Sequence, residues 1–161
     1  MKKNITSIFF TLLIIVGFSG CMEEKVSCKD KFTQIVIGQM VSPNIQILTI
    51  TKELYNVKPA LAFGYFSAYN MLKITGNENS LLEDNSRNDE DLKAIKSKVK
   101  EEFKNADLLL NSIKTISKDK DKIVCSANVK ADTLSYKSNY VVTYNIQYQN
   151  GNYSYELENI E

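Results

Sequence analysis

Polar and apolar residues alternate along the last third of the chain. The period of two predicts four β-strands, joined by polar connections, at residues 108–116, 122–131, 140–149 and 152–158. Strands that follow one another through such short connections favour an antiparallel meander with one face buried.

The last two strands have a predictable register. Asn150-Gly151 tolerates the positive φ angles of a two-residue hairpin turn, so Gln149 should pair with Asn152. The pairing then places six apolar or aromatic side chains on one face: Tyr144, Ile146, Tyr148, Tyr153, Tyr155 and Leu157. The other face carries Thr143, Asn145, Gln147, Ser154, Glu156 and Glu158.

A helical period precedes the strands. Asn88 is the expected N-cap, followed by acidic residues 89–91 and by an apolar stripe made of Leu92, Ile95, Val99, Phe103 and Ala106. The opposite face carries Lys93, Lys96, Lys100 and Lys104. This lysine face is either solvated or in contact with anionic lipid headgroups.

The first half of the chain has weaker signals. We predict a helix over residues 27–41, capped by Ser27 and ended by Ser42-Pro43-Asn44. Residues 45–55 fit a helix better than a strand, and the aromatic segment 60–74 is interpreted as a strand although its periodicity is ambiguous. Residues 75–89 are rich in Gly, Asn, Asp and Ser and predict a loop.

Together these elements predict an α+β fold. The N-terminal helix and the second amphipathic helix should pack on one face of a four-stranded antiparallel meander. The length of 161 residues suits one folded unit, which we place at residues 28–161.

The N-terminus has the pattern of an export signal. Lys2 and Lys3 precede an uncharged apolar run that is short for a membrane-spanning helix. The run ends in Phe18-Ser19-Gly20-Cys21, which resembles the lipobox of bacterial lipoproteins, although that family usually has Leu where Phe18 stands. The resemblance implies removal of residues 1–20, acylation of Cys21 and a lipidated tether at residues 21–27. An ordinary secretory signal or an uncleaved anchor is the alternative.

The resemblance also implies a location. Residue 22 is Met rather than the Asp that commonly retains such lipoproteins at the inner membrane. We therefore expect an outer-membrane anchor, with the domain in the periplasm or at the cell surface.

If Cys21 carries lipid, Cys28 and Cys125 remain as a pair in a compartment that permits disulfides. Cys28 shares a predicted helix face with Phe32, Ile35, Val36 and Met40, whereas Cys125 alternates with core positions of a strand. We predict a disulfide between them; two free buried thiols are the alternative.

The C-terminal third also resembles a group of small bacterial lipoproteins of unassigned function. The matching pieces are Ile113-Lys114-Thr115, Cys125-Ser126-Ala127, residues 140–144 and the hairpin at residues 150–153. The resemblance implies a cystatin-like α+β domain in which an N-terminal helix is joined to a curved sheet. It implies no reaction.

Composition removes several functional classes. The formal charge is +1, so no basic surface for nucleic acid is expected. The absence of histidine excludes His-based catalytic triads and His-ligated metal. We find no phosphate-binding loop or calcium motif, and therefore expect no cofactor, no metal and no enzymatic activity.

The chain contains nine tyrosines. Tyr144, Tyr148, Tyr153 and Tyr155 either belong to the core or line a binding surface, because tyrosine combines apolar area with a polar tip. We therefore expect a lipid-anchored envelope lipoprotein that binds or inhibits another envelope protein through an exposed aromatic or sheet-edge surface. The alternative is a periplasmic carrier of a small ligand, with a cavity between segment 60–74 and the sheet.

Overall fold

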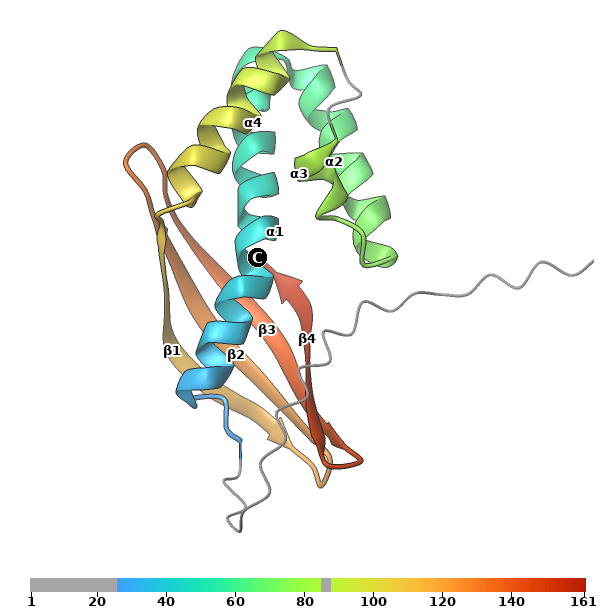
Figure 1. Ribbon diagram of the computed structural model, residues 1–161, viewed down its shortest axis with the longest axis vertical. Coiled ribbons are helices and arrows are strands. Elements are labelled where there is room, and N and C mark those ends of the chain that lie inside the picture. Colours follow the sequence, from blue (N-terminus) through green and yellow to red (C-terminus); the bar gives the residue numbers. More distant parts are fainter. Residues whose placement is uncertain (1–25, 85–87) are drawn as a thin grey trace, which may run out of the picture.

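Four strands of alternating polarity form one antiparallel sheet in the computed structural model, which describes residues 26–84 and 88–161. The strand order follows the sequence, and the strands are β1 (Asp107–Lys118), β2 (Lys122–Asp132), β3 (Lys137–Gln149) and β4 (Asn152–Ile160). Helix α1 (Lys31–Val57) lies along one face of this sheet (Figure 1). The predicted α+β fold class is confirmed. The predicted leader, Cys21 and most of the tether lie outside the described residues.

The predicted register of the last hairpin is also confirmed. Gln149 pairs with Asn152, Tyr148 with Tyr153, Ile146 with Tyr155 and Tyr144 with Leu157. Asn150 and Gly151 both have positive φ angles, as a two-residue turn with right-handed strand twist requires. The inner face of the sheet is fully buried at its centre, where Cys125, Val129, Val142 and Tyr144 lie.

Helix α1 begins later than the sequence pattern predicts. Its N-cap is Asp30, whose carboxylate accepts a hydrogen bond from the Thr33 backbone N–H at 3.1 Å, so Ser27 is not the cap. Cys28 therefore precedes the helix, and the predicted helix face is rotated. Phe32 and Ile35 are about half exposed, whereas Thr33, Val36 and Ile37 are buried.

The predicted end of this helix at Pro43 is wrong. A proline inside a helix removes one backbone hydrogen bond and costs about 3 kcal/mol, yet α1 continues for 14 residues beyond it. The reason is burial: Val41, Ile45, Ile47, Ile50 and Leu54 have no exposed surface. Each such side chain contributes about 1.5–3 kcal/mol when it leaves water, so the local cost of Pro43 is outweighed.

The aromatic segment forms a helix, not the predicted strand. Helix α2 (Pro59–Ile74) starts with proline in the first turn, a position where its missing N–H costs nothing. Ala62, Tyr65 and Tyr69 form its buried stripe, at spacings of three and four residues. Many of the other apolar side chains of α2 are exposed, which is why the helical period was hidden in the sequence.

A buried polar contact joins α1 to α2. The Tyr69 hydroxyl donates to Asn44 Oδ1 at 2.8 Å, and Asn44 Nδ2 donates to the Met40 carbonyl at 3.1 Å. Burial raises the pKa of Tyr69 to about 12. Because both groups are satisfied, the pair can lie in the core without the cost of an unpaired polar group.

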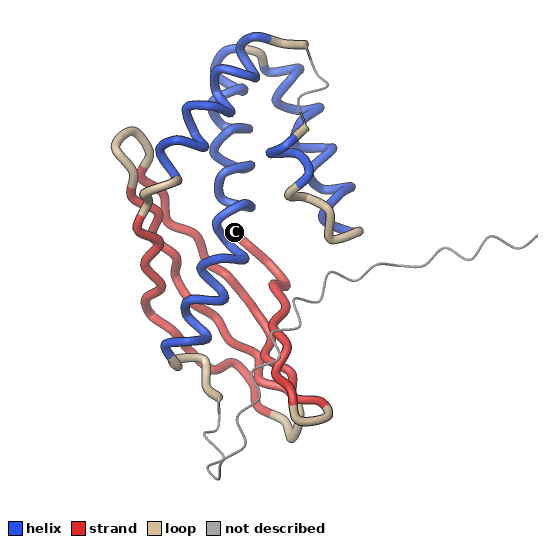
Figure 2. The backbone as a smooth tube through the Cα atoms, viewed as in Figure 1, coloured by secondary structure: helices blue, strands red, loops and turns tan. Residues whose placement is uncertain are grey.

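Two further helices complete the helical layer. The predicted loop 75–89 contains a short helix, α3 (Ser80–Glu83), and residues 85–87 lie outside the described part. Helix α4 (Glu90–Phe103) is capped by Asp89 rather than by Asn88. Figure 2 shows the helices gathered at one end of the molecule and the sheet at the other, with α1 running through both.

Ionic and polar contacts attach α4 at both of its ends. At the start, Lys58 Nζ lies 2.9 Å from Asp89 and 2.7 Å from Asp91, which lowers the pKa of Asp89 and raises that of Lys58. At the end, Glu102 accepts hydrogen bonds from the Ser135 N–H and the Thr133 hydroxyl in the β2–β3 loop. These bonds lower the pKa of Glu102.

A disulfide joins Cys28 to Cys125, with the two sulfur atoms 2.06 Å apart. Both residues are buried. The Tyr144 hydroxyl also donates to the Cys28 carbonyl at 3.0 Å. The chain before α1 is therefore attached to β2 by a covalent bond and to β3 by a hydrogen bond.

The disulfide closes a long loop, with a sequence separation of 97 residues. We expect the C28A/C125A double variant to lose about 4–5 kcal/mol in free energy of unfolding, because the unfolded chain gains the entropy that the bond removes. Urea denaturation of both proteins, with and without reductant, measures the loss. The double variant itself serves as the control, since reductant should not change it; equal stability of the two oxidised proteins would contradict this prediction.

Two buried tyrosines predict a loss of stability at high pH. Burial raises the pKa values of Tyr69 and Tyr144 to about 12, whereas a tyrosine in the unfolded chain titrates near pH 10. Between these values the unfolded chain releases protons that the folded chain retains, so stability falls as the pH rises from about 10 to 12. Urea midpoints across this range should fall less steeply for Y69F/Y144F than for wild type. Parallel slopes would show that these hydroxyls do not cause the loss.

Candidate functional site

The four tyrosines expected at a binding surface are divided by the structure. Tyr144 is fully buried and Tyr155 is half-buried against the core, with its ring 6.2 Å from that of Phe32. Tyr148 and Tyr153 are 44% and 40% exposed. Their rings lie 4.9 Å apart beside the β3–β4 turn. Tyr144 and Tyr155 therefore belong to the core. Of these four tyrosines, only Tyr148 and Tyr153 are exposed enough to contact a partner.

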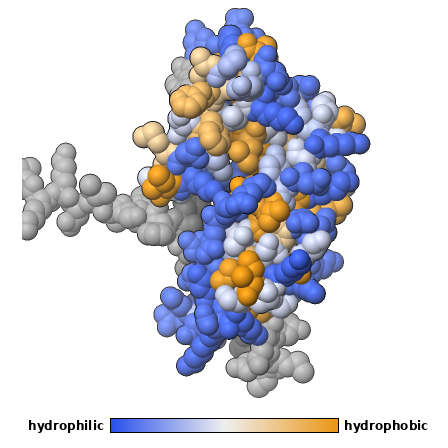
Figure 3. All heavy atoms as spheres, turned by 180° about the vertical axis from the view of Figure 1, so that it is seen from behind, coloured by the Kyte–Doolittle hydropathy of each residue, from blue (hydrophilic) through white to orange (hydrophobic). Residues whose placement is uncertain are grey.

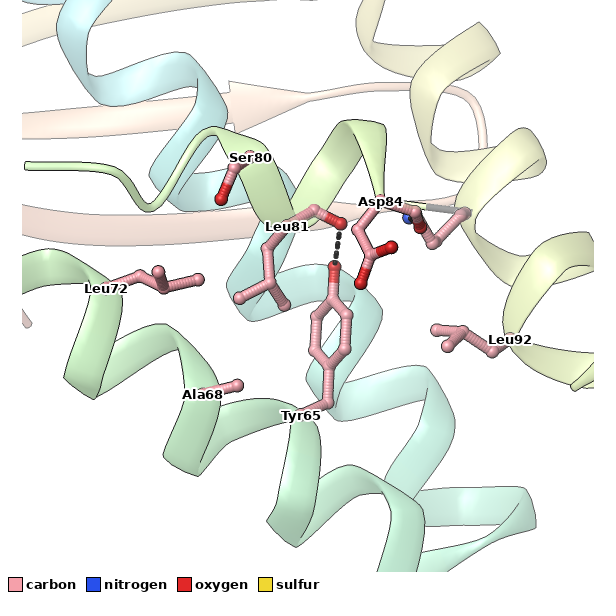
Figure 4. Close-up of a pocket in the computed structure, with 8 residues that line it drawn as sticks. Tyr65, Ala68, Leu72, Ser80, Leu81, Asp84 and Leu92 are labelled. Atoms are coloured by element: carbon pink, nitrogen blue, oxygen red, sulfur yellow. Dashed lines mark hydrogen bonds between the residues drawn. The ribbon is translucent and has the colours of Figure 1, made fainter. Parts of the chain in front are cut away.

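A cavity lies in the helical layer. Its volume is about 280 Å³, and its walls come from α2, α3, α4 and the residue after α3: Tyr65, Ala68, Leu72, Ser80, Leu81, Asp84, Leu92 and Lys96. Figure 4 shows Tyr65 reaching from α2 toward α3, where its hydroxyl donates to the Leu81 carbonyl at 3.4 Å. This cavity does not lie between segment 60–74 and the sheet, where the carrier alternative expected one.

Lys96 gives the cavity a charged wall. Its ammonium donates to the Asp84 carbonyl at 2.6 Å, and the residue is 5% exposed. The expectation that Lys96 belongs to a solvated lysine face is therefore wrong for this residue, although Lys93, Lys100 and Lys104 are exposed. The volume is at the lower limit of pockets that take small ligands, which span about 300–1,000 Å³.

The outer face of α2 is the main apolar surface of the helical layer. Phe63, Met71 and Ile74 are 76%, 72% and 87% exposed, and Phe66 is partly exposed beside them. At 100° per residue, positions 63, 66, 71 and 74 lie within an arc of about 140° on one side of a helix, an arc that also contains Ser67 and Asn70. Apolar side chains gather over the upper left of the molecule in Figure 3, the side on which α2 lies. We call this set the α2 outer face: Phe63, Phe66, Met71 and Ile74.

No charge interrupts this surface along most of the helix. Residues 59–72 contain no Asp, Glu, Lys or Arg, and the first charged side chain of α2 is Lys73. A solvated helix normally carries charged residues on its outer face. Neighbouring exposed apolar side chains of this kind are common at binding sites.

The shifted pKa values of four titratable groups have structural causes. Asp89 pairs with Lys58, Glu102 binds the β2–β3 loop, and the tyrosines Tyr69 and Tyr144 are shifted mainly by burial. Within residues 26–84 and 88–161, no group of His, Cys, Asp and Glu side chains is arranged to hold a metal ion. No helix in this part of the chain combines the length and the hydropathy needed to cross a bilayer.

No protein-family model, curated protein or solved structure matches this chain. The resemblance to small bacterial lipoproteins thus stays a prediction from the sequence.

The α2 outer face was not among the predicted site residues. The sequence did contain a signal for it: an uncharged, mainly apolar segment of fourteen residues that begins at Pro59, with apolar residues on every side. Had the segment been interpreted as a helix, the same residues would have indicated that part of its apolar surface has no place in the core.

Two aromatic residues of α2 should differ in their effect on stability. We expect Phe63→Ala to change the free energy of unfolding by less than about 0.5 kcal/mol, as exposed positions do. Tyr65→Ala, which empties a buried site two residues away, should cost about 3–5 kcal/mol. Urea denaturation of the two variants compares them, and equal losses would contradict the orientation of α2 described here.

Proposed function

We propose that this protein is a lipid-anchored bacterial envelope lipoprotein that binds another envelope protein, and that the α2 outer face is its contact surface. The anchor is supported by the leader and by the lipobox pattern that ends at Cys21. The binding role is supported by one observation above all: three large apolar side chains, Phe63, Met71 and Ile74, are each more than 70% exposed on a helix with a single charged residue, Lys73.

The chemistry of the surface suggests the partner. Phe and Met are enriched at the centres of protein interfaces, whereas charged residues are depleted there. A groove or a helix with apolar side chains would therefore bind the α2 outer face with little desolvation cost. The polar side chains on this side of α2 are few and uncharged, Ser67 and Asn70, so the face offers little to a highly charged ligand or to nucleic acid.

Location outside the inner membrane agrees with the disulfide. A bond between Cys28 and Cys125 forms and persists in oxidising compartments, such as the bacterial periplasm and the cell surface. Anchoring through two or three acyl chains would hold the domain stably at a membrane. We propose the outer membrane as that membrane, because residue 22 is Met.

A small-ligand carrier remains the second candidate. The cavity of about 280 Å³ beside Tyr65 and Ala68 favours this candidate. The ligand site would then lie in the helical layer and not, as the sequence suggested, beside the sheet. The partly polar wall formed by Lys96, Ser80 and Asp84 would suit a ligand with one polar group. The α2 outer face has no part in this function.

Photo-crosslinking in the native bacterium separates the two candidates. A photo-reactive amino acid at Phe63 should form one adduct with an envelope protein, and M71D/I74D on the same face should reduce that adduct at least fivefold. Cys21→Ser should abolish the adduct and the acyl-chain mass on the protein. The matched control is the same photo-reactive residue at Leu134, which is 99% exposed in the β2–β3 loop and should form no such adduct.

Two outcomes would contradict the proposal. An adduct at Phe63 that is unaffected by M71D/I74D would show that the face does not bind the partner. A crosslinker at Ala68 that captures a small molecule, while the one at Phe63 captures nothing, would replace the interaction role by the carrier role.

A further inference from the structure

One end of the domain brings together the start of the described chain and two hairpin turns. Figure 1 shows the first turn of α1, the β1–β2 turn and the β3–β4 turn at the same end. The Tyr148 backbone N–H donates to the Asp121 carbonyl at 2.9 Å, which joins the two turns. We call this end the N-terminal pole and define it as residues 26–32, 118–122 and 148–153.

The length of the chain before the pole limits its position. Val26 follows Cys21 by five residues, and five extended residues span at most about 18 Å. Acyl chains on Cys21 would therefore hold Val26, the first residue of the pole, within about 18 Å of the lipid surface. Helix α1 has 27 residues, and such a helix is about 40 Å long. The C-terminal end of α1, where α2 begins, is thus the part of this helix that lies farthest from the anchor.

The side chains of the pole fit a lipid headgroup layer. Tyr148 and Tyr153 form an exposed ring pair at the tip of the sheet. Tyrosine is enriched at membrane–water interfaces, because its ring is apolar and its hydroxyl is hydrated. Phe32, which is 45% exposed, lies against Tyr155 on the side of the pole where α1 begins.

The pole also carries an excess of basic charge. Residues 29–31 and 118–122 contain five lysines and three aspartates. Four of these lysines are exposed: Lys29, Lys31, Lys118 and Lys120. The fifth, Lys122, forms an ion pair with Glu158, with 3.6 Å between Nζ and Oε1. Asp30 is occupied as the N-cap of α1. Exposed lysines near a bilayer are attracted to anionic lipids.

We infer that the N-terminal pole rests on the headgroups of an anionic phospholipid membrane, so that the domain stands on this end and presents the helical layer away from the bilayer. The inference rests on the proposed lipid anchor and adds an orientation to it. In this orientation the lysines of α4 do not face the lipid, because α4 belongs to the helical layer (Figure 2).

The absence of tryptophan from the chain allows a direct test. Y153W introduces a single fluorophore at the pole, and F63W introduces one on the α2 outer face as the matched control. Each full-length, lipidated protein is reconstituted into vesicles of phosphatidylethanolamine and phosphatidylglycerol that contain lipid brominated near the headgroup. Y148W provides a second pole position should Y153W fail to fold, and urea midpoints establish that the variants are folded.

We expect brominated lipid to reduce the emission of Y153W at least twofold and that of F63W by less than a tenth. Replacement of phosphatidylglycerol by phosphatidylcholine should weaken the quenching of Y153W, since the lysines lose their anionic partners. Unchanged quenching after this replacement would overturn the part of the inference that concerns the lysines.

Other outcomes overturn the orientation or the anchor separately. Quenching of F63W that equals or exceeds that of Y153W, in protein that floats with the vesicles, contradicts the orientation and leaves the anchor in place. Protein that lacks the acyl mass and does not float with vesicles contradicts the anchor, and the inference falls with it.

Discussion

The burial of the second half of α1 is the constraint on which the rest of the structure depends. Without this burial, the helix would end at Pro43, and the aromatic segment 60–74 would lose the helix against which it packs. Ile45, Ile47, Ile50 and Leu54 contribute enough apolar burial to carry the helix through the proline. As a result, the first half of α1 packs on the sheet, and its second half packs at the centre of the helical layer.

Each half of α1 is held by a different kind of contact. The disulfide of Cys28 and the hydrogen bond from Tyr144 fix the chain just before the first turn to the middle of the sheet. In the second half, Tyr69 binds Asn44 one residue after the proline. Polar contacts in a core are costly unless both partners are satisfied, so they favour one arrangement over others. We therefore attribute the orientation of α1 to these bonds, and most of its stability to apolar burial.

The sequence predicted the sheet well and the helical layer poorly, for a physical reason. In the sheet, turn chemistry at Asn150-Gly151 and the polarity of the side chains depend on neighbours within a few residues, and both indicated the same register. Between residues 42 and 74 the secondary structure depends on distant residues. Packing of α1 against α2 and α4 outweighs the helix-breaking effect of Pro43, and packing against α1 makes the aromatic segment helical. Apolar side chains on a helix face that binds another molecule resemble core side chains, so the sequence pattern alone does not indicate which side of that helix is buried.

The candidate site was missed for the same reason. The sequence indicated tyrosines as possible contact residues, and the structure places Tyr144 in the core while it exposes Tyr148 and Tyr153. It exposes Phe63 and Ile74 as well, which no pattern had separated from core residues. Whether an aromatic side chain is exposed depends on which elements cover it, and that was not known until α2 was placed.

A comparison of α2 with α4 shows that packing alone does not explain the α2 outer face. Both helices lie against α1, and both bury about one side. Yet α4 has eight charged residues among 14, whereas α2 has one among 16. Had selection acted only on stability and solubility, the exposed positions 63, 71 and 74 would tolerate charged residues at almost no cost in folding free energy. Large apolar groups at these positions neither fill the core nor favour hydration of the surface, which supports the proposal that a second molecule covers them.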